Sequence, residues 1–438
     1  MSHRYSRNSD HIRHRTVPAP DNQALNNHII QLLSPMVYSQ SAYYQTLGMR
    51  DRILNLPLMV AAVLTLLWRQ VPSVNELTRM LHREDLLWAK AAQVSRQALT
   101  QRFLTFPHQI FERVLKELIP HLKVRWKNRN RPLPASLSWG LKHFHHIWAV
   151  DGSVLESLFL KLDSLKHLPI GQLAGKICVV IELGCQLPVQ IWFEENAKTH
   201  DCKFLDRILA LTKPKTLLLM DRGFYDFQWW SKLISQEVDF ICASKSNLVY
   251  QVVKNLSMTT SLKDRLITIS INSEAKQKLT IRLIEISYGK KTYRYVTSVT
   301  SPEILPPFVV ADIYSRRWRI EDGFHLVKRL LGLSYLWTGS VNGIKLQIWA
   351  TWLIYAVLID LSDEVAQTLQ LPLERISPEM VLRGLYHFNH AYNRGLANDP
   401  VAYLSAKENR DLGVVKRKRK QRKILDCRPY FSASISTS

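Results

Sequence analysis

Apolar residues recur at two different spacings along the chain. These spacings divide the chain into a central region of strands with helical regions on both sides. Between residues 29 and about 121, apolar residues recur at the three- and four-residue spacing of helices. The central runs TLLLM (216–220) and VDFICAS (238–244) are short and mostly apolar, which is typical of strands covered on both faces. From 361 to about 404 the helical spacing returns. The pattern therefore predicts an α/β protein with helical regions before and after its sheet.

The order of the central elements predicts the fold class. Before residue 248 the chain predicts three strands, a helix, a strand, a helix and a strand, at 146–151, within 176–194, and at 200–211, 216–220, 224–236 and 238–244. From 248 to 300, segments such as LTIRLIEISYG alternate apolar and polar residues and predict a β-rich insertion of antiparallel strands. A further helix begins at Tyr314. This order matches a ribonuclease-H-like layout, in which a mixed sheet is flanked by helices.

Shifts in composition predict the boundaries between these regions. The first residues are polar without a hydrophobic period, and the stretch KVRWKNRNRPLP is basic and ends in proline, as linkers often do. We expect a flexible basic tail at 1–30, a helical domain at 31–122, a basic linker at 123–140, an α/β domain at 141–335 that contains the insertion, a helical region at 336–405 and a basic tail at 406–438.

The helix that begins at Tyr314 carries a narrow polar stripe. With about 100° per residue and Tyr314 at zero, Arg317 lies at about 300°, Glu321 at about 340° and Lys328 at about 320°. A carboxylate between cations suits a site at which metal ions and phosphates meet. The alternative is an ordinary surface pair, because Arg317 and Glu321 are four residues apart and such pairs add only about 0.2–0.5 kcal/mol. Asp322, at about 80°, lies well off the stripe.

Two aspartates stand at the predicted carboxyl ends of strands, where open sheets of this kind form their sites. Asp151 and Asp221 each follow an apolar run and precede a glycine within two residues. Each could simply form a turn, as aspartates at strand ends often do. Three converging carboxylates, with Glu321 as the third, would repel one another and have raised pKa values unless cations lay between them. Two divalent ions would remove that repulsion, and oxygen ligands favour Mg²⁺ or Mn²⁺ over zinc.

These motifs together resemble those of bacterial insertion-sequence transposases of the DDE class. The family's tyrosine–x2–arginine–x3–glutamate–x6–lysine signature fits Tyr314, Arg317, Glu321 and Lys328. The segments WAVDGS and LLLMDRGFYD resemble its two aspartate motifs, and the β-rich insertion lies at the family's place between the second aspartate and the glutamate. The resemblance spans roughly residues 75–361.

The resemblance implies a DNA transposase that cuts double-stranded DNA at the ends of its own insertion sequence and joins the 3′ ends to target DNA. The metal-binding and catalytic residues would be Asp151, Asp221 and Glu321, with Mg²⁺ as the cofactor and Mn²⁺ as its substitute. Arg317 and Lys328 would hold phosphates of the transposon end, and Tyr314 would contact the DNA near the cut. Some relatives form a DNA hairpin and flip a base onto an aromatic residue of the insertion. Between 248 and 299 this chain has tyrosines but no tryptophan.

A possible DNA-reading element lies in the helical domain. Two short predicted helices, a polar turn and a helix that Ser95 can cap resemble a helix-turn-helix. The last helix carries Arg96, Gln97 and Arg102 on positions expected to be exposed, and these residue types can contact guanine and adenine edges. The alternative is a helical domain that grips only the DNA backbone.

Charge and cysteine usage narrow the class of partner and the compartment. The chain has 438 residues and 59 Lys plus Arg against 36 Asp plus Glu, a net charge of +23 that indicates a polyanionic partner such as DNA. The run Lys416–Lys423 has seven cations in eight residues and predicts a tail that orders on phosphate or stays solvated.

Five scattered cysteines without CxxC spacing predict reduced thiols in the cytoplasm. No secretory signal is visible, and the apolar run Ile348–Ile359 is shorter than the roughly 20 residues that span a bilayer, which predicts a buried core helix and no membrane association.

Two other functions fit the same residues. A ribonuclease-H-like nuclease would use the same three acids without strand transfer, and an inactive transposase relic would retain only DNA binding. A transposase must bring two element ends together, and we therefore also expect a dimer on DNA.

Overall fold

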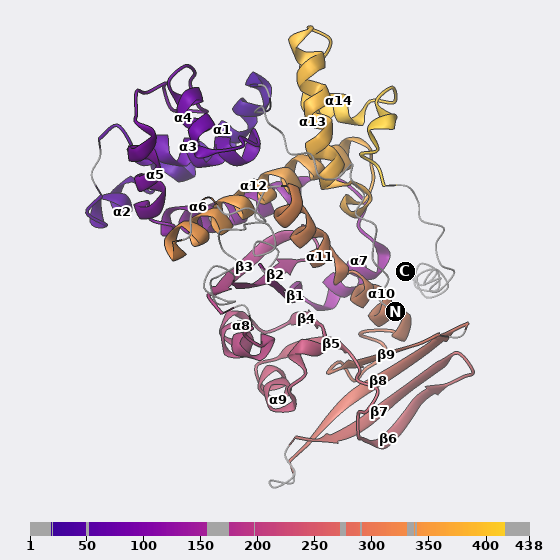
Figure 1. Ribbon diagram of the computed structural model, residues 1–438. Helices are drawn as coiled ribbons and strands as arrows, with labels where there is room; N and C mark the ends of the chain where they lie inside the picture. The colour runs from indigo at the N-terminus through magenta and orange to yellow at the C-terminus, as the bar shows by residue number, and fades with distance from the viewer. Residues whose placement is uncertain are drawn as a thin grey trace, which may run out of the picture. The chain divides into compact units, whose positions relative to one another are not determined.

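The computed structural model describes residues 19, 21–49, 52–155, 175–196, 198–271, 277–289, 291–330, 337 and 340–416. It divides into two compact units (Figure 1). We call the first the helical unit; it consists of Met1–Arg125, Leu326–Thr368 and Ser377–Val414. We call the second the sheet unit; it consists of Trp126–His325, Leu369–Ile376 and Val415–Ser438. The helical segments from both ends of the sequence therefore share one unit.

Several helices of the helical unit begin at polar capping residues. Its α-helices are α1 (Gln23–Tyr38), α2 (Ser41–Thr46), α3 (Leu56–Trp68), α4 (Val74–Leu81), α5 (Arg96–Thr105), α6 (Gln109–Asn128), α12 (Val341–Thr368), α13 (Pro378–Asn393) and α14 (Pro400–Ser405), with a π-helical turn η6 (Leu326–Leu330) and a 3₁₀ turn η8 (Arg410–Leu412). The side chains of Ser73 and Ser95 accept hydrogen bonds from the amides of Glu76 and Ala98, which satisfies donors that the first turn leaves unpaired. Helix α1 begins within the stretch expected to be a tail, and α6 runs into the expected linker.

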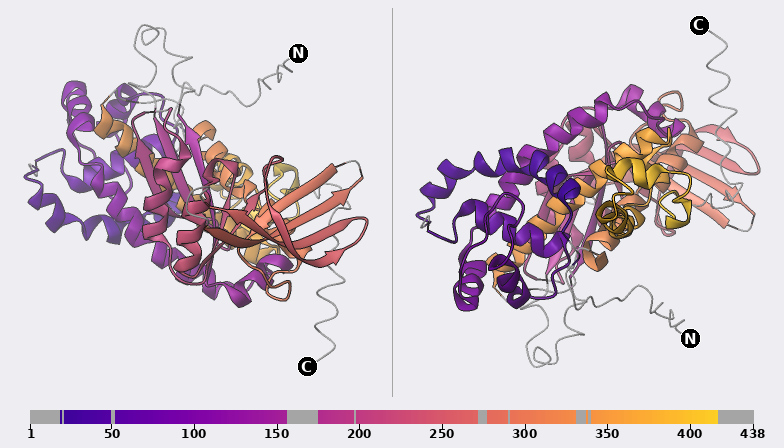
Figure 2. Two further views of the ribbon diagram at one scale, coloured as in Figure 1. Left: turned by 90° about the horizontal axis from the view of Figure 1, so that it is seen from below. Right: turned by 90° about the horizontal axis from the view of Figure 1, so that it is seen from above.

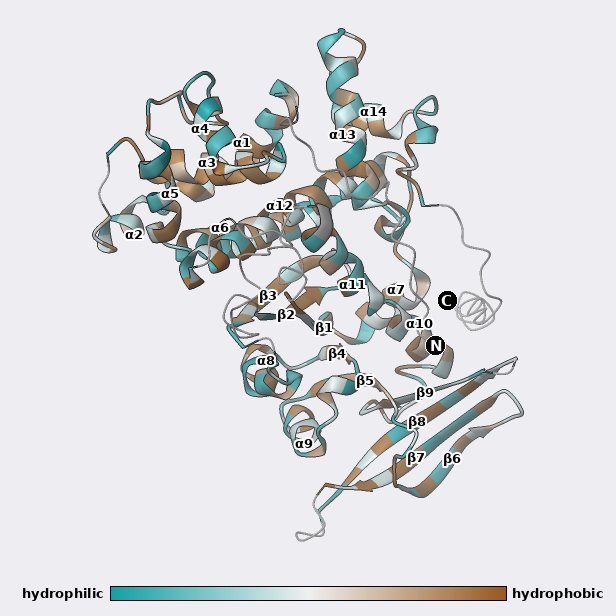
Figure 3. Ribbon diagram, in the orientation of Figure 1, coloured by the Kyte–Doolittle hydropathy of each residue, from teal (hydrophilic) through white to brown (hydrophobic). Residues whose placement is uncertain are grey.

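The most apolar helices of this unit are α3 and α12, much of which is drawn in brown in Figure 3. By length and composition α12 could cross a membrane, the one such helix among the described residues, and 94% of its most apolar window is buried inside the protein. Buried charge within α12 is paired, because Arg125 of α6 contacts Asp360 at 3.0 Å and also contacts Glu364. Such pairing is what burial of a charged group in a protein core requires.

The described residues of the sheet unit form a nine-stranded mixed sheet with the order β3-β2-β1-β4-β5-β9-β8-β7-β6 (Figures 1 and 2). The strands are β1 (His146–Val154), β2 (Lys176–Glu182), β3 (Leu187–Glu194), β4 (Thr216–Met220), β5 (Val238–Ala243), β6 (Gln251–Met258), β7 (Leu262–Ser270), β8 (Lys278–Tyr288) and β9 (Lys291–Thr297). Strands β1, β4 and β5 are parallel, whereas β2 and β3 and all of β6 to β9 pair antiparallel. The predicted β-rich insertion therefore extends the central sheet through the pairing of β9 with β5.

Helices cover both faces of the central strands. One face packs against α8 (Leu205–Leu211), α9 (Phe227–Ser235) and the 3₁₀ turn η4 (Asp201–Phe204), and its core contains Trp148, Val150, Phe204 and Trp230. The other face packs against α7 (Ala135–His143), α10 (Pro307–Ser315) and α11 (Trp318–His325). Because side chains alternate along a strand, Ile147 lies on the α10 side, where a side chain on Gly140 of α7 would collide with it.

The predicted order of strands and helices in this region is confirmed, with two local differences. Strand β1 does not end at Asp151 but continues to Val154, because residues 151–154 pair with β2. The helix predicted from Tyr314 to Leu333 is not continuous. It breaks after Ser315 into α10 and α11, and then into the π-helical turn, while residues 331–333 lie outside the described residues.

Candidate active site

The register of two parallel strands brings the predicted aspartates to one level of the sheet. Ala149 of β1 pairs with Leu219 of β4, so that Asp151 and Asp221, each two residues further on, stand at equivalent positions. Asp221 leaves its strand as the cap of the 3₁₀ turn η5 (Arg222–Phe224), and its Oδ1 accepts a hydrogen bond from the Gly223 amide at 2.7 Å. Asp151 Oδ1 accepts from the Gly152 amide at 2.9 Å. By the alternation of side chains, Asp151 lies on the face that carries α10 and α11.

Helix α11 brings Glu321 to this face, and a single guanidinium connects it to the first aspartate. Arg317 donates from Nη1 to Asp151 Oδ2 and from Nη2 to Glu321 Oε1, both at 2.8 Å. The Arg317 side chain is only 9% exposed, whereas that of Glu321 is 34% exposed. The pairing of Arg317 with Glu321 is thus the predicted i, i+4 pair. Because Arg317 also binds Asp151 of β1, whose side chain is largely buried, it is not an isolated surface pair.

The carboxyl group of Asp151 has a raised pKa. Burial raises the pKa of Asp151 to about 6 from an ordinary 3.8, Arg317 opposes that rise, and the negative charges of Asp221 and Glu321 add to it. The main cause is therefore burial, and the repulsion expected between converging acids is a smaller contribution to this pKa.

Tyr314, in the last turn of α10, contacts the end of the strand that precedes Asp221. Its hydroxyl donates to the carbonyl oxygen of Met220 at 3.1 Å, one residue before Asp221, and its ring packs against Tyr295 of β9. Burial raises its pKa above the ordinary value. Tyr314 and Arg317 do not share the uniform helical stripe that the sequence predicts. Between α10 and α11 the amides of Arg316, Arg317, Arg319 and Ile320 bond to carbonyls three residues back, which overwinds the chain at this point.

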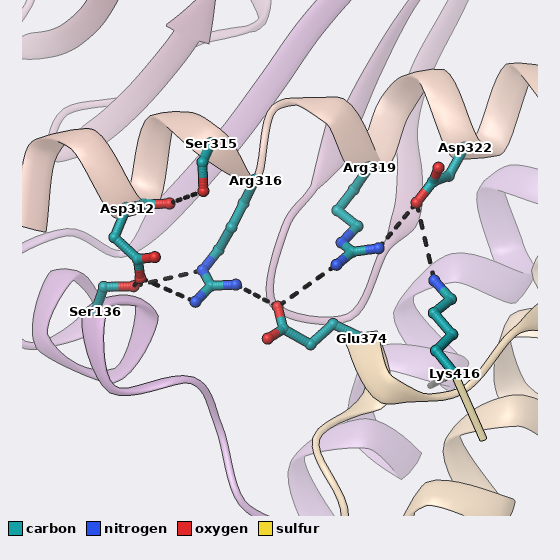
Figure 4. Close-up of polar contacts among 8 residues, drawn as sticks. All are labelled: Ser136, Asp312, Ser315, Arg316, Arg319, Asp322, Glu374 and Lys416. Carbon is teal, nitrogen blue, oxygen red and sulfur yellow. Dashed lines mark hydrogen bonds and ion pairs between the residues drawn. The ribbon is translucent and has the colours of Figure 1, made fainter. Parts of the chain in front are cut away.

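Asp322 lies away from the three carboxylates, as its position on the helix predicts. It is 61% exposed and pairs with Arg319 at 2.8 Å and with Lys416 at 3.9 Å (Figure 4). The same network ties α10 and α11 to η7 (Leu373–Arg375), because Arg316 and Arg319 both reach Glu374. The other predicted member of the signature, Lys328, lies in the π-helical turn of the helical unit.

The carboxylates have the chemistry that a hard divalent cation requires, since all of their donor atoms are oxygens. Among the described residues, no three acidic, histidine or cysteine side chains already stand in coordinating geometry. The reason is visible at Arg317, whose guanidinium lies between Asp151 and Glu321. The three carboxylates fit an ion only if Arg317 turns aside. The ion would then supply the positive charge that the guanidinium now supplies.

A cavity of about 590 Å³ opens beside the strand end and is lined by aromatic and cationic side chains. Tyr293 and Tyr295 of β9, Tyr314 of α10 and the exposed ring of Trp318 contribute the aromatic surface. Arg222, which follows Asp221, and Arg294 contribute positive charge. The aromatic residues predicted from the sequence lay in the insertion and did not include Trp318, which lies next to Arg317 in the signature segment.

The helical unit only partly matches the expectation of a helix-turn-helix. Residues 82–95 separate α4 from α5, far more than the turn of about three or four residues in that motif. Arg96 and Gln97 are exposed on α5 as expected. Arg102 was expected to be exposed but is half-buried and bonds to the hydroxyl of Tyr44, because α5 packs its later turns on aromatic side chains.

One further acid at this end of the sheet was not predicted from the sequence. Asp201 of η4 lies against the glycines that follow both aspartates and pairs with Lys176. The available signal was the glycine after each strand-end aspartate, since glycine often marks a close approach. The four described cysteines are free, as expected, while Cys427 lies outside the described residues.

Comparison with known proteins points to one class. Residues 172–357 match the family model described as a transposase DDE domain, a stretch that contains Asp221 and Glu321 and begins after Asp151. The transposase InsG for the insertion sequence element IS4 of Escherichia coli is 24% identical over 170 residues, which cover 36% of this chain and 37% of that relative. These similarities support a transposase of the DDE class.

Two other relatives agree. The protein y4zB of Sinorhizobium fredii, which also carries a transposase name, is 24% identical over 215 residues, or 45% of this chain and 60% of the relative. A probable transposase for insertion sequence element IS5377 from Geobacillus stearothermophilus is 24% identical over 210 residues, or 47% and 55%. The chain thus spans at most 60% of the length of these relatives.

Proposed function

We propose that this protein is a DNA transposase that cuts at the ends of its own insertion sequence and joins the 3′ ends to target DNA. The observation that carries the proposal is that one guanidinium joins Asp151 and Glu321, while Asp221 stands level with Asp151 at the end of the neighbouring parallel strand. The similarity to transposases favours this reading over a nuclease of the same fold. The strand order β3-β2-β1-β4-β5, with β2 antiparallel to β1, supports a ribonuclease-H-like core whose sheet the insertion extends.

In this proposal the three carboxylates hold Mg²⁺, for which Mn²⁺ substitutes. When bound, the ions would activate a water or a 3′-hydroxyl and stabilise the attacking and leaving oxygens of the phosphodiester. Arg317 leaves Asp151 and Glu321 and pairs with a phosphate of the DNA, for which its planar guanidinium is well suited. Asp151 must lose its proton before it can serve as a ligand, so that its raised pKa sets a lower limit of pH for ion binding.

The remaining DNA contacts come from both units. Tyr314 would contact the DNA near the cut and Lys328 would hold a phosphate of the element end. The exposed Arg96 and Gln97, with the half-buried Arg102 behind them, would bind DNA through the helical unit. We further propose that two copies act together on two element ends, in the cytoplasm at the nucleoid.

The cavity beside Asp221 provides a place for an unstacked base of the element end. Its tyrosines and Trp318 offer aromatic faces on which a base can stack, and stacking of this kind is worth about 1–3 kcal/mol per base. Arg222 and Arg294 would face the attached phosphates. The lack of tryptophan between 248 and 299 is then no obstacle to base flipping, since Trp318 supplies an equivalent ring.

The test is a matched pair of substitutions on adjacent residues. Duplexes carrying the inverted repeats that flank this gene are incubated with the protein and Mg²⁺, and the products are resolved by length. Glu321→Gln should reduce cutting by at least about a thousandfold, because removal of one ligand charge disrupts electrostatic stabilisation that is worth several kcal/mol. Binding of the duplex should stay within about threefold of the wild type. Asp322→Asn makes the same chemical change one residue away, on an exposed side chain, and should cut normally.

The products also decide between the alternatives. Joined DNA supports a transposase, whereas only nicked or shortened DNA would indicate a nuclease without strand transfer. Binding without any cutting by the wild type would indicate an inactive relic. Equal cutting by Glu321→Gln and the wild type would contradict the assignment of the three acids.

A further inference from the structure

Asp201 approaches the two strand ends from the side of the sheet opposite to Glu321. The position that a Cβ atom would take on Gly152 lies well inside van der Waals contact with Asp201 Oδ1. The corresponding position on Gly223 lies 2.9 Å from Asp201 Oδ2 and 2.9 Å from Asp221 Oδ1. One carboxylate is therefore in contact with the backbone that follows Asp151 and with the backbone that follows Asp221.

Alternation along the strands explains why Asp201 can reach this position. Trp148, Val150 and Gly152 lie on the face that carries η4 and α8, whereas Asp151 lies on the other face. Gly152 is the position on this face where β1 has no side chain, and Asp201 fills the space that a side chain would occupy. Turn η4 also packs on η5, where Cys202 Sγ donates to the carbonyl oxygen of Gly223.

Lys176 fixes the Asp201 carboxylate in this place. Its Nζ contacts Asp201 Oδ1 at 2.8 Å and donates to the carbonyl oxygen of Thr199 at 2.9 Å. The Lys176 side chain is 10% exposed, and Lys176 pairs in register with Val154 at the end of β1. A buried lysine that binds both the carboxylate and the preceding segment leaves η4 little freedom to move.

We propose that Asp201, held by Lys176, is a positioning residue that sets the spacing of Asp151 and Asp221. It touches neither of the reacting groups, but it supports the backbone immediately after each aspartate. Loss of this support would let the two glycine segments move, and coordination of divalent ions tolerates little displacement of its ligands. The inference rests on the proposed function, because it assumes that Asp151 and Asp221 bind ions.

The test measures Mn²⁺ affinity by electron paramagnetic resonance on the full chain, without DNA and without turnover. Asp201→Ala should weaken Mn²⁺ binding by about 10–100-fold, the usual effect of removing a residue that supports metal ligands. Asp201→Asn keeps the shape of the side chain and an oxygen acceptor for Lys176. This variant should bind Mn²⁺ within about threefold of the wild type. Asp206→Ala, five residues along and exposed, removes the same charge and should leave the affinity unchanged.

A second measurement covers the case in which Asp201→Ala does not fold. A side chain on Gly152 should displace Asp201, so Gly152→Ala should weaken Mn²⁺ binding by itself. The position of a Cβ on Gly152 lies closest to Asp201 Oδ1, so the loss follows from displacement of the Asp201 carboxylate. Wild-type Mn²⁺ affinity in Gly152→Ala would contradict the proposal.

Two outcomes separate this inference from the proposed function. If Asp151→Asn abolishes Mn²⁺ binding while Asp201→Ala binds as tightly as the wild type, the positioning role is wrong and the proposed site stands. If Asp151→Asn binds Mn²⁺ as well as the wild type does, the proposed site itself is wrong.

Discussion

At the residue scale, the central feature is an arginine that occupies the place of a cation. Arg317 pairs with both Asp151 and Glu321, and its side chain is almost completely buried. Its transfer from carboxylates to a DNA phosphate would vacate the space that an ion needs. Binding of DNA and binding of ions would then favour each other, since each draws Arg317 away from the same state.

Removal of this guanidinium should make the fold depend on the ion. Arg317→Ala removes the guanidinium that pairs with both Asp151 and Glu321, and loss of one member of a buried pair costs up to about 3–5 kcal/mol. Mn²⁺ should raise the melting temperature of this variant more than that of the wild type, because no guanidinium has to be displaced. Thermal unfolding with and without Mn²⁺ measures the difference, with Arg319→Ala as the control. An equal or smaller rise in Arg317→Ala would contradict the placement of the ion.

The pH dependence of ion binding should follow Asp151. Since its pKa is raised to about 6, the carboxyl holds a proton in the folded chain at pH values where an unfolded one, with a pKa of 3.8, is already charged. This group therefore stabilises the fold increasingly as the pH falls from 7 to 4, while Mn²⁺ affinity should fall about tenfold per pH unit below 6. Titration of Mn²⁺ binding from pH 5 to 8 tests this. A flat profile across pH 6 would refute the assignment.

At the element scale, the insertion supports the helices that carry the site. Arg282 of β8 makes two hydrogen bonds of 2.7 Å to Asp264 of β7, and both side chains are completely buried. The same guanidinium donates to the carbonyl oxygen of Leu305 at 2.7 Å, just before α10 begins. The insertion is therefore joined to α10 through buried polar contacts as well as through the pairing of β9 with β5.

Breaking this buried pair should destabilise the sheet unit. Asp264→Ala leaves a fully buried Arg282 with no carboxylate, and the expected loss of unfolding free energy is about 3–5 kcal/mol. Urea denaturation of the full chain measures the loss. Lys263→Ala, the exposed neighbour on the same strand, should change stability by less than about 0.5 kcal/mol. A comparable effect of the two substitutions would show that the pair is not a structural link.

At the scale of the whole molecule, the net charge of +23 predicts that the proposed binding to DNA weakens as salt rises. The basic run begins at Lys416, which lies near Asp322 of α11 (Figure 4), and its other residues lie outside the described residues. Deletion of 417–438 removes six of the seven cations of this run. The slope of log K against log salt should become shallower by about 0.9 for each phosphate that the tail no longer neutralises. Duplex binding measured from 50 to 300 mM salt tests this, and an unchanged slope would mean that the tail does not bind DNA.

Local sequence was sufficient for much of the central domain. Wholly apolar runs and alternating runs predicted β4, β5 and the insertion because burial on two faces or on one face imposes those patterns. The spacing of Arg317 and Glu321 predicted their contact, since residues four apart meet on any helix. The break between α10 and α11 could not be read from the sequence, because every residue there is compatible with a continuous helix.

By itself, the sequence determined the order of the central elements and the positive charge, and it singled out the three candidate acids, because these depend on residue type and spacing. Only the tertiary structure decided that β1 and β4 are neighbours in register, that Arg317 closes on Asp151, and that Asp201 lies behind both strand ends. Each of these is a contact between segments far apart in the chain, fixed by which strands pair and which side chain is missing. Such contacts follow from packing of the whole sheet unit, which no local pattern encodes.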